Sequence, residues 1–129
     1  MNTPHCRIHF LMVLLLSLVL PQHRASADAK PLTEKAKIEA LISYLENLQD
    51  ATFIRNGSDY TSKNAAKFLR AKWSAHEEDA QTAADFIAKL ASGSSSSGKP
   101  YIIKFKDGSQ KNSEDVLNAQ LKKLEAKPK

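Results

Sequence analysis

The chain has 129 residues, with 19 basic against 14 acidic side chains, one cysteine and four histidines. Cys6 and three of the histidines fall within residues 1–27, which leaves His76 as the single histidine of residues 28–129. Residues 28–129 therefore exclude cysteine nucleophiles, disulfides, and zinc sites built from cysteine or several histidines. Their length suits one domain with one hydrophobic core.

The first residues predict an export signal. Arg7 precedes an apolar run over residues 10–20, and the small residues Ala25, Ser26 and Ala27 come before Asp28. This order is typical of a secretory signal, and the apolar run is shorter than the about 20 residues of a membrane span. We therefore expect cleavage after Ala27 and a periplasmic or secreted protein of residues 28–129, which touches the membrane only through the signal before cleavage.

Residues 33–50 predict the first helix of the domain. Its apolar residues recur at spacings of three and four, and Thr33 can cap its start. "TFIR" follows as a short strand over Thr52–Arg55, because β-branched and aromatic residues favour strands. Asn56-Gly57 then predicts a turn with positive φ.

Two further helices come next. Residues 62–77 place Ala65, Phe68, Leu69 and Trp73 on an inner face, with a basic stripe of Lys63, Lys67 and Arg70 outward. Residues 82–92 form a shorter helix that Thr82 caps, with Asp85 at the reciprocal position of a capping box and Gly93 at its end.

A second strand and a last helix complete the pattern. "PYIIKF", residues 100–105, predicts a strand, and Asp107-Gly108 a tight turn. Ser113 is expected to cap a final helix whose apolar face carries Val116, Leu117, Leu121 and Leu124. We therefore predict one helix-rich α+β domain over residues 28–129, with about four helices, two short strands that can pair, and a short flexible C-terminal tail.

The stretch "GSSSSGKP", residues 93–100, matches most of the phosphate-loop pattern of nucleotide-binding proteins. That loop requires a strand before it and a helix after it, whereas here a helix is predicted to enter and a strand to leave. Pro100 also replaces the hydroxyl residue that would hold magnesium. Ser96 and Lys99 have the S-x-x-K spacing of acyl-enzymes, but the expected strand prevents the necessary helix. We expect no nucleotide and no cofactor.

His76 could serve a Ser-His-acid site, or a loose metal site with Glu77, Glu78 and Asp79. The polar end of a helix accounts for the same residues without a catalytic or metal-binding role, so we predict neither a catalytic nor a metal-binding residue. The basic stripe lacks exposed aromatic neighbours, and an exported protein meets no nucleic-acid partner, so a solvated helix face is the better interpretation.

Two blocks, "FIRNGSDYTSKNAAKFLRAKW" and "TAADFIAKLASGSSSSGKPYIIK", together with the export signal, resemble the YfeK-like family of small exported proteobacterial proteins of unknown function. The resemblance covers most of residues 28–129. It implies an exported, single-domain protein, and it implies no catalytic or binding residues, because none is established for the family.

Pairing of the two predicted strands would bring their polar ends to one rim. Its cations, loop amides and tyrosines suit a carboxylate, a sugar or an acidic partner loop. The candidate binding residues are Arg55, Asn56, Tyr60, Gly98, Lys99 and Tyr101. Turn chemistry alone is the competing explanation for the glycines, Asn56 and Pro100.

We expect a non-enzymatic envelope module that binds an envelope protein, a glycan or an anionic ligand. The alternatives are a small hydrolase of an envelope polymer, which would use His76 or a carboxylate pair, and an electrostatic binder of anionic envelope surfaces through the lysine-rich C-terminal part.

Overall fold

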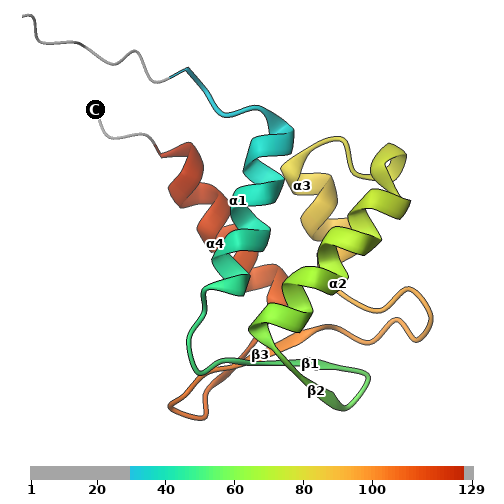
Figure 1. Cartoon of the computed structure of the whole chain (residues 1–129), viewed down its shortest axis with the longest axis vertical. Coiled ribbons are helices and arrows are strands. Elements are labelled where there is room, and N and C mark those ends of the chain that lie inside the picture. The colour runs from blue at the N-terminus through green and yellow to red at the C-terminus, as the bar shows by residue number, and fades with distance from the viewer. Residues whose placement is uncertain (1–29, 127–129) are drawn as a thin grey trace, which may run out of the picture.

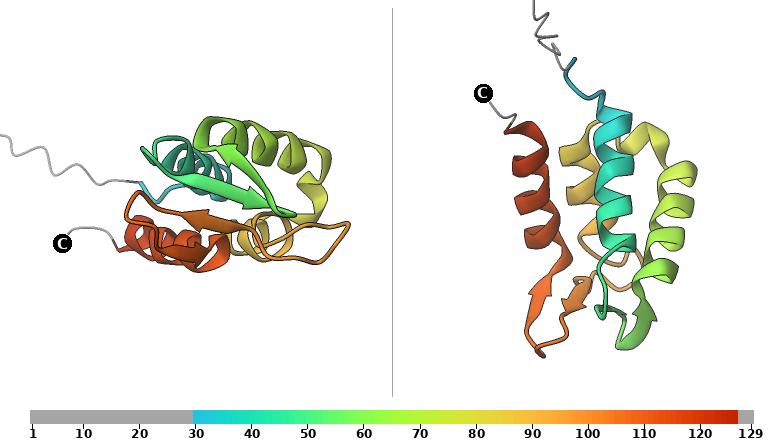
Figure 2. Two further views of the ribbon diagram at one scale, coloured as in Figure 1. Left: turned by 90° about the horizontal axis from the view of Figure 1, so that it is seen from below. Right: turned by 60° about the vertical axis from the view of Figure 1, so that its left-hand side comes forward.

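The computed structural model describes residues 30–126, so the predicted export signal and the end of the predicted tail lie outside the described residues. Four strands form one antiparallel sheet in the order β2-β1-β3-β4. The helices stand on one side of the strands (Figure 1, Figure 2). The strands are β1 (Thr52–Arg55), β2 (Ser58–Thr61), β3 (Ile102–Lys104) and β4 (Gln110–Asn112).

The helices and the inner face of the sheet share one hydrophobic core. The larger helices are α1 (Glu34–Glu46), α2 (Ser62–Ala75) and α4 (Ser113–Glu125). The shorter ones are η1 (Glu77–Asp79), a 3-10 turn, and α3 (Ala83–Asp85), which continues as the π-helical η2 (Phe86–Ala91). The predicted α+β class with four helices is confirmed. Within residues 30–126, none of the helices combines the length and the apolar composition that crossing a membrane requires.

Helix α1 follows its sequence pattern closely. Ile38, Leu41, Ile42 and Leu45 are buried, and the Ala36 N–H donates to the predicted Thr33 cap at 3.2 Å. Helix α2 buries Ala65, Ala66 and Leu69. The periodicity of three to four residues therefore located both helices, although α1 ends at Glu46, before the predicted end at residue 50.

Two strands are present where none was predicted. Strand β1 has the predicted bounds and pairs with β3, as the prediction allowed. In addition, β2 pairs with the outer side of β1, and β4 pairs with the outer side of β3. Every residue of β2 and β4 is exposed. Strands at the edges of a sheet lack a buried partner on one side, so their sequences carry little apolar alternation. Asn56 and Gly57 have φ angles of 49° and 76°, as a two-residue hairpin turn requires.

The start of α4 differs from the prediction. Asn112 occupies the cap position without a side-chain cap bond, and Ser113 is the first helical residue. Ser113 is buried, its N–H donates to the Tyr101 carbonyl at 2.8 Å, and its hydroxyl has no partner among residues 30–126. The helix therefore begins where the chain leaves β4 to pack against the core, one residue earlier than a Ser113 cap would place it.

The predicted basic stripe of α2 is divided between two roles. Lys63 and Lys67 are exposed, whereas the Arg70 guanidinium lies 2.8 Å from a Glu39 carboxylate oxygen and 2.9 Å from one of Glu46. These two ion pairs join α2 to α1 and raise the pKa of Arg70. Arg70 therefore belongs to the contact between two helices and not to a solvated face.

Glu34 connects three helices through its carboxylate. It accepts from the Lys37 ammonium at 2.8 Å and from the Ala83 N–H at 2.7 Å, and Lys37 in turn donates to Glu125 of α4 at 3.1 Å. The Ala83 contact caps α3 in addition to the predicted Thr82 cap, whose hydroxyl accepts from the Asp85 N–H at 3.0 Å. Hydrogen bonds from Lys37 and then from Ala83 lower the pKa of Glu34.

A lowered carboxyl pKa predicts a specific pH dependence. The stabilisation from ionised Glu34 is complete above its ordinary pKa of 4.5 and is lost as the pH falls through the lower folded-state pKa. Glu34→Gln should therefore flatten the acid side of the stability curve. Urea unfolding at a series of pH values measures this slope. Glu78→Gln, at an exposed carboxylate without an ion pair among residues 30–126, is the control, and equal slopes in the two variants would contradict the role of Glu34.

Candidate functional site

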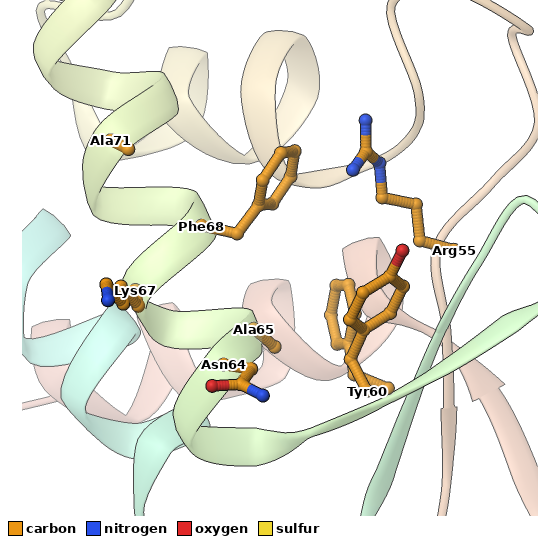
Figure 3. Close-up of a pocket in the computed structure, with 8 residues that line it drawn as sticks. Arg55, Tyr60, Asn64, Ala65, Lys67, Phe68 and Ala71 are labelled. Atoms are coloured by element: carbon orange, nitrogen blue, oxygen red, sulfur yellow. The ribbon is translucent and has the colours of Figure 1, made fainter.

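A pocket of about 390 Å³ lies between the β1–β2 hairpin and helix α2 (Figure 3). Phe53 and Arg55 are two residues apart on β1 and so share one face of the sheet. Tyr60 is the cross-strand partner of Phe53 and joins them on that face. Helix α2 supplies the opposite wall, from positions three and four residues apart, with Asn64, Ala65, Lys67, Phe68 and Ala71.

Arg55 is the central polar residue of this pocket. Its guanidinium carbon lies 4.2 Å from the centre of the Phe68 ring, a favourable cation–π geometry, and Figure 3 shows Phe68 extending from α2 toward Arg55. The Arg55 Nε is buried and has no hydrogen-bond partner among residues 30–126. Within the same residues, Arg55 forms no ion pair with a carboxylate. Buried donors are nearly always paired, so this guanidinium edge has capacity for an acceptor.

Tyr101 packs against two aromatic residues that line the pocket. Its ring is buried between Phe53 and Phe68, with centre-to-centre distances of 5.3 Å and 6.1 Å. The Lys72 ammonium donates to the Tyr101 hydroxyl at 3.2 Å, to the Leu90 carbonyl at 2.9 Å and to the Gly93 carbonyl at 3.1 Å. Lys72 thus connects the C-terminal end of η2 to the side chain of Tyr101.

The electrostatics of this region are positive. Burial lowers the pKa of Lys72, and the nearby charge of Arg55 lowers it further. Burial raises the pKa of the Tyr101 hydroxyl, an effect that the Arg55 charge and a hydrogen bond from the Arg55 side chain partly oppose. Among residues 30–126, Arg55 and Lys67 line the pocket, whereas no Asp or Glu does. The site therefore favours a negatively charged group.

Comparison with known proteins identifies the family. Residues 32–125 match the family described as "Family of unknown function (DUF5329)". The chain belongs to the DUF5329 family. The uncharacterized protein YfeK of Salmonella typhimurium (strain LT2) is 39% identical over 89 residues, which cover 69% of this DUF5329 chain and 71% of that protein. The predicted resemblance to YfeK-like proteins of unknown function is therefore confirmed. No solved structure matches this chain.

The DUF5329 fold brings the two polar blocks of the sequence together at Asn56. The Ser97 hydroxyl donates to Asn56 Oδ1 at 2.5 Å, and Asn56 Nδ2 donates to the Ser94 hydroxyl at 3.3 Å. Asn56 therefore connects the β1–β2 turn to the serine loop, residues 93–100. Of the predicted binding residues, Arg55 and Tyr60 line the pocket and Asn56 lies beside it at the turn.

Three other predicted binding residues are placed differently. The Gly98 N–H donates to the Ser94 carbonyl at 2.9 Å and the Lys99 N–H to the Ser97 hydroxyl at 3.2 Å, so these loop amides are already used within the loop. Lys99 is exposed and does not line the pocket. Tyr101 is only 1% exposed, which places it in the core and not on an open rim.

The stretch "GSSSSGKP" is a closed connection in this DUF5329 fold. The chain enters it from η2 and leaves it for β3, the order predicted and the reverse of a phosphate loop. Gly93 pairs with Pro100 across its base, and the Ser94 N–H donates to the Lys99 carbonyl at 2.9 Å. A Cβ atom at Gly93 would lie 2.9 Å from that carbonyl oxygen, so the close approach requires glycine.

His76 lies outside the pocket, at the end of α2. It is exposed, and its Nδ1 is 3.4 Å from the Asp79 carboxylate. Within residues 30–126 no group of three or more His, Cys, Asp or Glu side chains is placed to hold a metal ion. His76 and the pocket therefore do not form one site.

Sequence reasoning missed the helical wall of the pocket and Lys72. Phe68 was assigned to the core, yet it is half-buried and lines the pocket with Asn64 and Lys67. The spacing of Asn64, Lys67, Phe68 and Ala71 would have placed them on one helical face. For Lys72 the sequence carried no signal, because its acceptors come from residues far along the chain.

Proposed function

We propose that this protein is an exported, non-enzymatic binding module that captures an anionic group at Arg55. The observation that supports it is the buried Arg55 Nε, which has no acceptor and no carboxylate partner among residues 30–126. Leaving a buried donor unpaired costs about 1 to 3 kcal/mol, so an incoming acceptor recovers free energy there. Lys67 at the pocket wall adds attraction for the same charge.

Binding fits the pocket better than hydrolysis does. A covalent or general-base hydrolase needs a nucleophile or carboxylate near a base. The pocket offers hydrogen-bond donors from Arg55, Tyr60, Asn64 and Lys67, but in the part of the chain that the structure describes no histidine, serine or carboxylate lines it. Export is proposed on the charged start, apolar run and small residues before Asp28. The mass of the protein recovered from the envelope fraction of cells tests export, and a mass that retains residues 1–27 would contradict cleavage.

An NMR titration of the purified protein tests capture at Arg55. Sodium acetate and sodium phosphate are added at constant ionic strength while the Arg55 Nε–H resonance and the backbone amide resonances of β1 and β2 are followed, the latter in the variants as well. We expect a saturable shift with at least one of these anions. Arg55→Gln should abolish saturable binding, because glutamine keeps polarity but removes the guanidinium charge.

Lys99→Gln is the matched control, since it removes one exposed charge outside the pocket. It should leave the titration unchanged. A melting temperature measured for each variant separates loss of binding from loss of folding. The proposal fails if neither anion gives a saturable shift, or if folded Arg55→Gln binds as the original chain does.

A further inference from the structure

We infer that the pocket takes a carboxylate carried on an apolar group, with the carboxylate at Arg55 and the apolar group against Tyr60 and Phe68. This inference rests on the proposed function and specifies its ligand class. Its basis is the combination, in one pocket, of an incompletely paired guanidinium edge with walls that are largely aromatic and aliphatic.

The apolar part of the ligand follows from the walls. Phe53, Ala65, Phe68 and Ala71 line the pocket, and the Tyr60 ring closes one side. Tyr60 is 38% exposed, one of two large hydrophobic side chains among residues 30–126 that stand open to solvent. A bare inorganic anion would leave these surfaces in water, whereas an attached apolar group would cover them. The volume of about 390 Å³ lies in the range of small-molecule sites.

The choice of a carboxylate follows from the guanidinium geometry. One face of the Arg55 guanidinium is covered by the Phe68 ring, and hydrogen-bond acceptors meet its N–H groups in the guanidinium plane, along an edge. The unpaired Nε belongs to the edge that pairs side-on with the two oxygens of a carboxylate. This Nε is closed to water, so a side chain that covers it must turn aside as the ligand enters. Phosphoryl groups carry more charge and are usually met by several cations or free backbone amides. Here the amides of Gly98 and Lys99 already donate within their own loop.

Two sources could supply this chemistry: a free apolar carboxylic acid, or the C-terminal end of a peptide chain. Strand β2 lies beside the pocket at an edge of the sheet, so within residues 30–126 no strand pairs with the outer side of its backbone. A peptide whose terminal carboxylate sits at Arg55 could add along that edge, as extended peptides do on exposed strands. Both sources share the recognised group, and peptide length distinguishes them.

Calorimetric titration of the full chain with three probes tests the ligand class. The probes are N-acetyl-phenylalanine, its C-terminal amide, and acetate. We expect N-acetyl-phenylalanine to bind about tenfold or more tightly than either of the other two, because only it offers both the charge and the ring. Arg55→Gln should remove the preference for acid over amide. Tyr60→Ala, at a residue outside the buried core, should reduce the preference over acetate.

The outcomes separate this inference from the proposed function. If acetate binds at Arg55 as tightly as N-acetyl-phenylalanine does, anion capture stands and the apolar requirement is wrong. If the amide binds as tightly as the acid, the carboxylate assignment is overturned. If no probe shows binding that depends on Arg55, and the acetate and phosphate titration is also negative, both proposals fall.

A four-alanine peptide with a C-terminal phenylalanine identifies the source. Binding about tenfold tighter than N-acetyl-phenylalanine supports capture of a chain end along β2, whereas equal affinity supports a small free acid. In both cases the amidated peptide should bind more weakly than the acid. An amidated peptide that binds equally well would overturn recognition of the terminal carboxylate.

Discussion

Replacing Tyr101 with alanine is expected to lower the free energy of unfolding by about 4 kcal/mol, the loss typical of removing a buried aromatic ring. The ring contacts Phe53 of the sheet and Phe68 of α2, and its hydroxyl accepts from Lys72. Its backbone N–H donates to the Ser92 carbonyl at 3.0 Å. The substitution would thus leave a cavity where the sheet, α2 and the serine loop meet. Urea unfolding followed by circular dichroism measures the change.

Two matched variants make this result interpretable. Tyr60→Ala removes an identical side chain at a 38% exposed position and should cost less than about 1 kcal/mol. Tyr101→Phe keeps the ring and removes only the hydroxyl that Lys72 contacts, so a loss of about 1 kcal/mol is expected. Equal losses for Tyr101→Ala and Tyr60→Ala would contradict the burial of Tyr101. Its burial also means that a probe attached at Tyr101 reports on the core and not on a bound partner.

The helices were predictable because each buries one continuous apolar stripe. Helix α1 is the clearest case, where Ile38, Leu41, Ile42 and Leu45 repeat at helical spacing and are all buried. Strands β2 and β4 were not predictable in the same way. "QKN" is polar throughout and "SDYT" has Tyr60 as its single large apolar side chain, and only their pairing with β3 and β1 makes them strands. Tertiary pairing, and not local sequence, determines these edges.

The candidate site was predictable in part, for reasons that individual residues illustrate. Arg55 ends a correctly predicted strand, so its place at the rim of the sheet followed from the sequence. Tyr101 could have been assigned to the core from the alternation of an extended chain. It points to the same face as the buried Ile103, whereas the exposed Lys104 points to the opposite face. The approach of Phe68 to Arg55 depends on how α2 packs over the hairpin, which no local pattern specifies.

Replacing Lys72 with methionine should lower the free energy of unfolding by about 2 kcal/mol. The ammonium donates to the carbonyls of Leu90 and Gly93 at the end of η2 and to the Tyr101 hydroxyl. Hydrogen bonds from a charged donor contribute about 1.5 to 3 kcal/mol each. Burial and the charge of Arg55 oppose that gain, as the lowered pKa of Lys72 indicates, so the net loss is smaller than the sum of three such bonds. Methionine retains the apolar stem, which confines the change to the ammonium.

Lys63→Met on the same helix is the control, because Lys63 is exposed and makes no ion pair within residues 30–126. It should change the free energy of unfolding by no more than about 0.5 kcal/mol. Hydrogen exchange adds a local test. Lys72→Met should speed exchange of the Tyr101 N–H, which donates to the Ser92 carbonyl at the end of η2. If Lys72→Met is as mild as Lys63→Met and leaves that exchange unchanged, Lys72 does not hold η2 and the serine loop beneath the pocket, and Arg55 is positioned by the sheet and Phe68 alone.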